Sequence, residues 1–174
     1  MNYYGAKEMA ESWRTVRKNT IQVAEDIPED KYSFRATPDT MSVSELLAHL
    51  ATTPYWAQQC HFVDKKSSVG MEDFGKWMGA AAKASAALGS KSAIVDALKK
   101  DGDQFASQME TMSDAQLGEK VDLPHGTSKT RFEMLLGVKE HEMHHRAQLF
   151  LIERLLGIVP HLTRARQAAM AARA

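Results

Sequence analysis

The chain is organised around residues 139–148, which read KEHEMHHRAQ. They lie within a pattern that repeats every three or four positions and comprises Met134, Val138, His141, His145, Gln148, Ile152 and Leu155. This spacing predicts one inward-facing seam of a helix in a bundle. The ends of the seam are apolar, but its centre is polar, and polar side chains are costly to bury without partners. Two explanations are open for His141 and His145: core histidines bonded to backbone or water, or imidazoles at i and i+4 that share a metal ion.

Similar seams predict three further helices and therefore a bundle. The four helices span about residues 6–27, 42–63, 91–112 and 130–157. Their connectors are mostly longer than hairpin turns, and no segment shows the alternation of apolar and polar residues that is typical of a strand. The sequence thus predicts an all-α four-helix bundle with long connectors over residues 1–160, followed by an Ala- and Arg-rich tail over residues 161–174.

Local signals refine this prediction. Ser42 with Glu45, and Thr130 followed three residues later by Glu133, have the spacing of capping boxes at helix starts. Pro54 predicts a kink within the second helix. Residues 64–90 remain undecided, because glycines and serines indicate a loop while the Ala-rich part favours a helix. Residues 122–127 indicate a turn or a short hairpin.

Composition excludes several classes of protein. The 174 residues include 22 basic and 22 acidic side chains, so no net charge attracts nucleic acid or an anionic membrane. The single cysteine, Cys60, excludes an internal disulfide framework and a Cys-rich zinc site. No apolar run approaches the roughly 20 residues that span a bilayer, and the first residues are not a signal peptide. We expect a cytoplasmic protein that binds neither nucleic acid nor membranes.

Two familiar metal motifs match residues 141–145 incompletely. His-Glu-x-x-His is the zinc metalloprotease helix, in which the Glu acts as general base. Its extended form requires Gly at position 148 and His at position 151, where this chain has Gln148 and Leu151. The other form requires a later acidic ligand, and nothing after Glu153 is acidic. A ferritin-like di-iron site requires a second Glu-x-x-His helix, which the chain lacks. Both assignments are disfavoured.

His49 offers a third imidazole. It lies on the flank of the second helix, and a bundle can bring this flank against His141 and His145. Three histidines and a solvent molecule form the open pattern of catalytic zinc sites, and nickel or iron also suits imidazole. A metal there would lower the pKa of a bound water or thiol.

Five neighbouring residues are candidates for supporting this site. Glu45 and Gln148 lie within one turn of the proposed ligands and could orient their rings, although a capping role explains Glu45 equally well. Thr53 and Trp56 lie beside His49, where Trp56 either lines a pocket or packs in the core. His144 borders the ligand face.

Two stretches of the chain resemble a known family. Residues 27–31 (IPEDK) with 41–50 (MSVSELLAHL), and residues 141–149 (HEMHHRAQL) with 155–157 (LLG), are similar in order and spacing to signatures of the DinB/YfiT-like superfamily. The resemblance extends over about residues 5–160. It implies a DinB-type four-helix bundle, often a homodimer, with a divalent metal held by His49, His141 and His145. The chain departs from the pattern at Ala147, where Gly is usual.

The resemblance also implies an activity. Some members of the superfamily are thiol-dependent S-transferases or isomerases that use mycothiol, bacillithiol or glutathione. We therefore expect a divalent-metal-binding protein, with Zn or Ni ahead of Fe, that is a metal-dependent hydrolase or thiol S-transferase. Its partners would be a small-molecule substrate and a low-molecular-weight thiol as cosubstrate. The alternative is a non-catalytic, dimeric bundle that binds a metal or ligand. An enzyme requires an open coordination position, whereas a structural site is closed by a fourth protein ligand.

Overall fold

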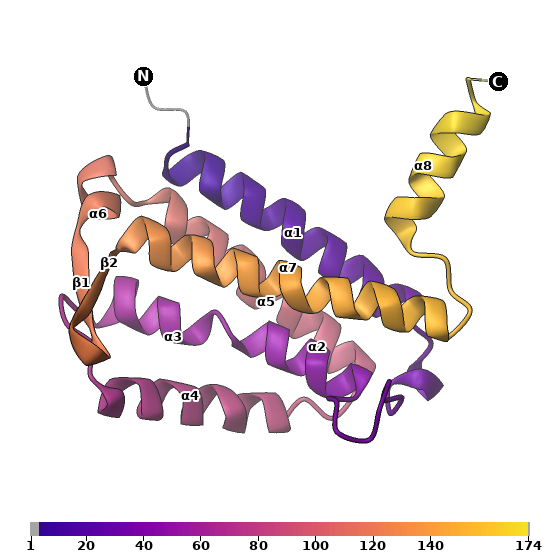
Figure 1. Ribbon diagram of the computed structural model, residues 1–174, viewed down its shortest axis with the longest axis horizontal. Coiled ribbons are helices and arrows are strands. Elements are labelled where there is room, and N and C mark those ends of the chain that lie inside the picture. Colours follow the sequence, from indigo (N-terminus) through magenta and orange to yellow (C-terminus); the bar gives the residue numbers. More distant parts are fainter. Residues whose placement is uncertain (1–3, 174) are drawn as a thin grey trace.

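The computed structural model describes residues 4–173, apart from the side chain of His125. It confirms the helical bundle (Figure 1). Three of the four bundle helices are continuous and the fourth is broken. They are α1 (Ala6–Asp26), α5 (Lys91–Glu110), α7 (Arg131–Leu155), and the run of α2 (Val43–Thr52), α3 (Tyr55–Gln58) and the π-helical turn η2 (Gln59–Val63). The short turn η1 (Glu29–Lys31) lies in the connector between α1 and α2. No helix in residues 4–173 is long and apolar enough to cross a membrane.

Both predicted capping boxes form and set the starts of α2 and α7. The Glu45 backbone N–H donates to Ser42 Oγ at 3.2 Å, while the Ser42 N–H donates to Glu45 Oε2 at 2.7 Å. Thr130 and Glu133 make the same pair of bonds, at 3.1 and 2.7 Å. These bonds satisfy backbone donors that a helix start leaves free. At the other end of α7, Gly157 adopts a positive φ of 78°, which suits glycine after a helix.

The predicted kink in the second helix is confirmed at Pro54. Helix α2 ends at Thr52 and α3 begins at Tyr55. Proline has no N–H, so residue 54 cannot make the helical hydrogen bond to the carbonyl four residues earlier, which belongs to Leu50. The Leu50 carbonyl oxygen instead accepts a bond from Arg17 Nη2 of α1 at 3.1 Å. The break therefore creates an acceptor that another helix fills.

The segment that the sequence left undecided contains α4 (Met71–Ala86), which packs against α2. Its buried residues are Trp77 and Ala81, and Trp77 packs in a core cluster with Cys60, Val121 and Met134. The connection from α5 to α7 contains α6 (Asp114–Gly118) and the antiparallel strands β1 (Lys120–Leu123) and β2 (Thr127–Thr130), joined by the turn η3 (Pro124–Gly126). This hairpin lies at one end of the bundle (Figure 1). The turn or short hairpin predicted at residues 122–127 is confirmed. Its four-residue strands are too short for the alternation of apolar and polar residues by which a strand is recognised in a sequence.

The tail forms an additional helix, α8 (His161–Ala171), which projects from the bundle (Figure 1). No residue of α8 is buried. It is held near its start by an ion pair between Arg164 and Asp26 of α1 at 2.6 Å, and by a 3.1 Å bond between His161 Nε2 and Asn19 Oδ1. Residues 1–3 of the predicted bundle and residue 174 of the predicted tail lie outside the described residues.

The buried face of α7 is rotated relative to the seam expected from its sequence. Gln148 and Leu155 are exposed, although the pattern placed both inward. Glu142 and Glu153 are buried instead, at 1% and 0% exposure. The buried positions are Arg131, Met134, Leu135, Val138, Glu142, Leu149, Ile152 and Glu153. The histidine-bearing centre of the helix therefore lies at the border of the core.

Gly102 of α5 lies where the side chain of Arg17 from α1 passes close to the α5 backbone. An added Cβ would lie 2.7 Å from Arg17 Cγ and 3.1 Å from Arg17 Cδ. These atoms lie in the middle of a buried side chain and cannot move aside freely.

We expect Gly102→Ala to lower the free energy of unfolding by about 1–2 kcal/mol, because the overpacking against Arg17 outweighs the better helix propensity of Ala. Urea denaturation would measure this, with Gly79→Ala, where the added Cβ meets nothing within 4 Å, as control. Equal stability gains in both variants would contradict it.

Candidate metal centre

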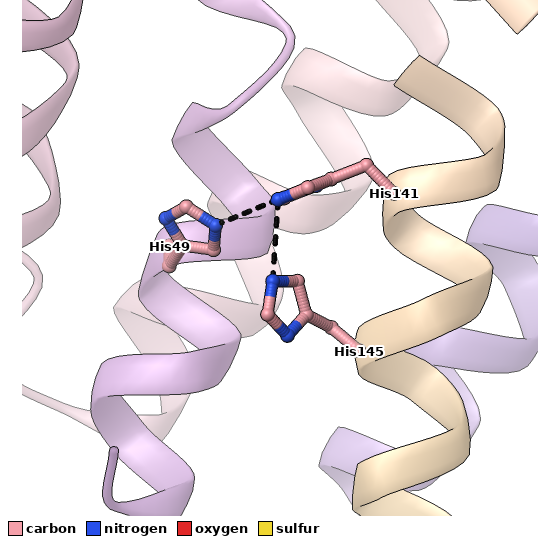
Figure 2. Close-up of side chains that lie close together, drawn as sticks. All are labelled: His49, His141 and His145. Atoms are coloured by element: carbon pink, nitrogen blue, oxygen red, sulfur yellow. Dashed lines mark hydrogen bonds between the residues drawn. The ribbon is translucent and has the colours of Figure 1, made fainter. Parts of the chain in front are cut away.

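Three histidines from two helices converge at the border between α2 and α7. His49 projects from α2, and His141 and His145 project from α7 toward it (Figure 2). The Nε2 atom of His141 lies 3.2 Å from the Nε2 atoms of both His49 and His145. One ligand nitrogen from each ring lies within 4.8 Å of the others. The structure therefore brings together the three residues that the sequence singled out as ligands.

The spacing of these nitrogens suits a metal ion. Zn–N bonds of about 2.0–2.1 Å place two nitrogens of a tetrahedral site about 3.3 Å apart, close to the 3.2 Å separations here. A single proton on His141 Nε2 can satisfy only one of its two contacts fully, whereas a cation between the rings satisfies both. No fourth His, Cys, Asp or Glu joins the group in the part of the chain that the structure describes.

The surroundings of His141 and His49 favour the neutral form of these two rings. Burial, followed by the neighbouring His145 ring, lowers the pKa of His141 to about 4. Burial lowers the pKa of His49 as well, and His145 adds to the effect. A neutral imidazole retains the lone pair that a metal requires. The two helices therefore hold nitrogen donors ready at neutral pH.

Thr53 and Gln148 contact the ligand rings, as their sequence positions suggested. Thr53 Oγ1 lies 3.3 Å from His49 Nε2 and donates to the His49 carbonyl at 2.7 Å. Gln148 Oε1 accepts from His145 Nδ1 at 2.7 Å. Because Nδ1 carries the proton in that bond, His145 Nε2 keeps its lone pair and faces His141. Gln148 thus selects the tautomer that can bind a metal.

Gln148→Ala should weaken metal binding by about 10-fold, because His145 loses the acceptor that fixes its tautomer and ring orientation. Competition against a chromophoric chelator would measure the dissociation constant for Zn²⁺. Gln148→Glu, which keeps an acceptor at this position, should retain the wild-type affinity or exceed it. Equal affinity of the Ala variant and the wild type would show that the bond to His145 has no such role.

The other predicted neighbours occupy different places. The exposed His144 lies next to the site, with its ring centroid 5.0 Å from that of His145 and its Nε2 3.3 Å from Gln148 Nε2. Glu45 caps α2 and pairs with Arg35 at 2.6 Å, so its carboxylate does not orient His49. Trp56 packs with Phe74 and His61. Trp56 follows His49 by seven positions, which corresponds to roughly 10 Å along a helix axis at about 1.5 Å per residue. It therefore belongs to the core rather than to the histidine cluster.

Two hollows adjoin the cluster. The large hollow, of about 610 Å³, lies between α2, α4 and residues 35–41, and its lining includes His49, Thr53 and Glu45. The small hollow, of about 330 Å³, is lined by His145, Gln148, Leu46, Leu151 and Ile152, together with Ala36. Thr40 and Met41 line both. The connector before α2 thus separates two spaces that each reach one ligand. Residues 35–40 of the connector lie between the two signature stretches and belong to no helix seam, so their sequence gave no sign of this role.

The glutamate of the His-Glu-x-x-His motif turns away from the histidines. Glu142 is 1% exposed, and its Oε2 lies 2.8 Å from Nη2 of Arg17, itself 3% exposed. Burial raises the pKa of Glu142, and the charge of Arg17 opposes that shift. A carboxylate buried in an ion pair cannot serve as the general base of a metalloprotease, which agrees with the incomplete motif.

Comparisons with known proteins give a family match and several structures of similar fold. The sequence profile of the DinB superfamily matches residues 12–149. Among proteins with curated functions, none matches the chain.

Several solved structures share the fold. A DinB-like protein from Bacillus subtilis, YjoA, is 22% identical with a TM-score of 0.66, over 86% of this chain and 92% of that one. YfiT from Bacillus subtilis, described as a probable metal-dependent hydrolase with an unusual four-helix bundle topology, is 14% identical with a TM-score of 0.68, over 91% of each chain. A mycothiol-dependent maleylpyruvate isomerase is 12% identical with a TM-score of 0.61, over 84% of this chain and 61% of that one.

Proposed function

The chain belongs to the DinB superfamily, and we propose that it is a divalent-metal-dependent enzyme that transfers a low-molecular-weight thiol to a small electrophile. The observation that carries the proposal is the cluster of three imidazole nitrogens, 3.2 Å apart in two of its pairs, with no fourth protein ligand among the side chains that the structure describes. An open coordination position is typical of catalytic metal sites. Zn or Ni is the expected metal, and Fe also suits three histidines.

The residues of the cluster would bind the metal, and the residues around it would orient the ligand rings. A divalent metal held by His49, His141 and His145 would supply Lewis acidity and lower the pKa of a bound thiol or water. Gln148 holds His145 in the required tautomer, and the Thr53 hydroxyl lies beside the ligand nitrogen of His49. The walls of the small hollow are mostly apolar, whereas the large hollow is lined by polar and charged side chains as well as apolar ones.

The two hollows favour a reaction of two molecules. The large hollow carries Arg35, Asp39 and Glu45 at its rim and suits the more polar reactant. The small hollow is mainly apolar, with Leu46, Leu151 and Ile152 in its wall, and suits a compact electrophile. The likeness to a mycothiol-dependent isomerase supports thiol chemistry. The likeness to YfiT supports hydrolysis as the second candidate, which needs only one organic reactant and water.

The first test is metal content. Untagged protein purified without chelator should contain about one equivalent of Zn, Ni or Fe, and His49→Ala and His145→Ala should each lose it. His161→Ala, which removes a histidine on α8, serves as the matched control and should retain the metal. A wild type that neither contains metal nor takes it up on addition would overturn the proposal.

Activity then separates the two reactions. The metal-loaded protein should consume an electrophile such as maleimide or chlorodinitrobenzene only with a low-molecular-weight thiol present. It should leave p-nitrophenyl acetate, an activated ester, intact. Thiol-independent ester cleavage that depends on His141 would instead establish the hydrolase.

A further inference from the structure

Arg17 connects the two helices that carry the histidines, although its own helix carries no ligand. Its Nη2 donates to the Leu50 carbonyl of α2 at 3.1 Å and lies 2.8 Å from Glu142 Oε2 of α7. Leu50 directly follows His49, and Glu142 directly follows His141. A single nitrogen of α1 thus contacts the residues next to two of the three imidazoles.

The attachment point on α2 exists because of Pro54. A residue with an N–H at position 54 would occupy the Leu50 carbonyl within the helix. Proline leaves that oxygen free, and Arg17 donates to it. Helix α2 is only ten residues long and is interrupted immediately afterwards. It also contacts α7 sparingly compared with the extensive packing of α1 on α5. Direct packing therefore does little to fix the distance between His49 and the α7 histidines.

The Arg17 side chain is confined along its whole length. Gly102 of α5 offers no side chain where Arg17 Cγ and Cδ pass. The guanidinium carbon lies 4.8 Å from the centre of the Trp13 ring, and Trp13 Nε1 donates to the Gly102 carbonyl at 3.0 Å. Because Gly102 and Trp13 confine the Arg17 side chain, its terminal Nη2 atom is held in one position.

A buried ion pair of this kind is not explained by stability. Desolvating Arg17 and Glu142 costs about as much as their attraction returns, so apolar residues of similar volume commonly give an equal or more stable fold. In some proteins, however, buried polar or ionic groups select one arrangement of the helices over others. We propose that Arg17, with Glu142 as its anchor on α7, is a positioning residue that holds His49 against His141 and His145. Its relevance to metal binding rests on the proposed function.

The double variant Arg17→Met/Glu142→Met tests this inference, because it removes both charges together and should remain folded. Its Co²⁺ dissociation constant, measured by visible absorption, should rise about 10–100-fold, as for the loss of groups that orient metal ligands. The Co²⁺ spectrum should also change, since the ligand geometry relaxes. Glu142→Gln keeps an acceptor for Arg17, so its affinity and spectrum should stay close to those of the wild type even though the lost charge lowers the stability of the fold. Leu117→Ala in α6 alters a buried residue of another helix and should leave the affinity unchanged.

A metal-free measurement separates this inference from the proposed function. The His49 and His141 ring centroids lie 5.0 Å apart, so nuclear Overhauser contacts between the rings should be visible in the apo protein and lost in the double variant. If the wild type shows these contacts, the double variant loses them and the wild type binds no Co²⁺, the proposed function fails and the positioning role stands. If the double variant keeps both the contacts and the wild-type affinity, the positioning role is overturned and the metal centre stands.

Discussion

Arg17→Met is expected to lower the free energy of unfolding by about 3–5 kcal/mol, because removing one partner leaves the other charge buried without compensation. The stranded group is the carboxylate of Glu142, whose side chain is 2% exposed. Reversible urea denaturation at pH 7, with metal chelated from all samples, measures the change. Chelation matters because a ligand that binds only the folded state adds its own stabilisation.

The matched control is again the double variant Arg17→Met/Glu142→Met. It should recover most of the loss and come within about 1 kcal/mol of the wild type, since two apolar side chains replace two buried charges. A double variant as unstable as Arg17→Met alone would mean that the single substitution acts by lost packing. A small effect of Arg17→Met, below about 1 kcal/mol, would show that water or another group already neutralises Glu142.

Glu153→Gln should stabilise the protein at alkaline pH and leave it nearly unchanged in acid. Burial, together with the nearby carboxylate of Asp26, raises the pKa of Glu153 from 4.5 to about 7, while Arg164 and Arg154 act in the opposite direction. Neither carboxylate oxygen has a hydrogen-bond partner among the described residues. The folded protein therefore favours the protonated form of this side chain.

The sign of the pH dependence follows from that shift. Below pH 4.5 both the folded and the unfolded chain hold the proton on Glu153. Between pH 4.5 and about 7 the unfolded chain releases it and the folded chain retains it, so stability is lost as the pH rises. The loss levels off above pH 7 and amounts to about 3 kcal/mol. Glutamine has no proton to release and escapes this loss.

Unfolding free energies of wild type and Glu153→Gln, compared from pH 4.5 to pH 8.5, measure the effect. Their difference should grow in favour of the variant across this range and then level off. Glu72→Gln alters an exposed carboxylate on α4, hydrated in both states, and should give a constant difference. A constant difference for Glu153→Gln as well would show that this carboxyl is ionised in the folded protein at neutral pH.

Much of the local structure can be predicted from the amino-acid sequence. The two capping boxes, the kink at Pro54 and the glycine at the end of α7 each depend on residues within four positions of one another. Interactions over so short a distance are nearly the same in any fold that contains the helix. The pairing of His141 with His145 belongs to the same class, because the i, i+4 spacing places both rings on one helix face.

The rotation of α7 was not predictable in this way. The spacing of apolar residues placed Gln148 and Leu155 inside and gave no sign that Glu142 and Glu153 would be buried. A seam with three polar residues at its centre has no strong apolar direction, so packing against α1 and α2 decides which face is covered. The two buried glutamates, which carry the largest predicted effects on stability, follow from that packing.

The helices and their ends, the His141–His145 pair and membership of the family follow from the sequence, because each rests on short-range spacing or on motifs in a set order. Three features arise only in the assembled bundle. His49 meets His141 across 92 positions, the connector before α2 separates two hollows, and Arg17 contacts both helices that carry the ligands. Their geometry depends on helix crossing and rotation, which are set by the packing of the whole core rather than by any local pattern.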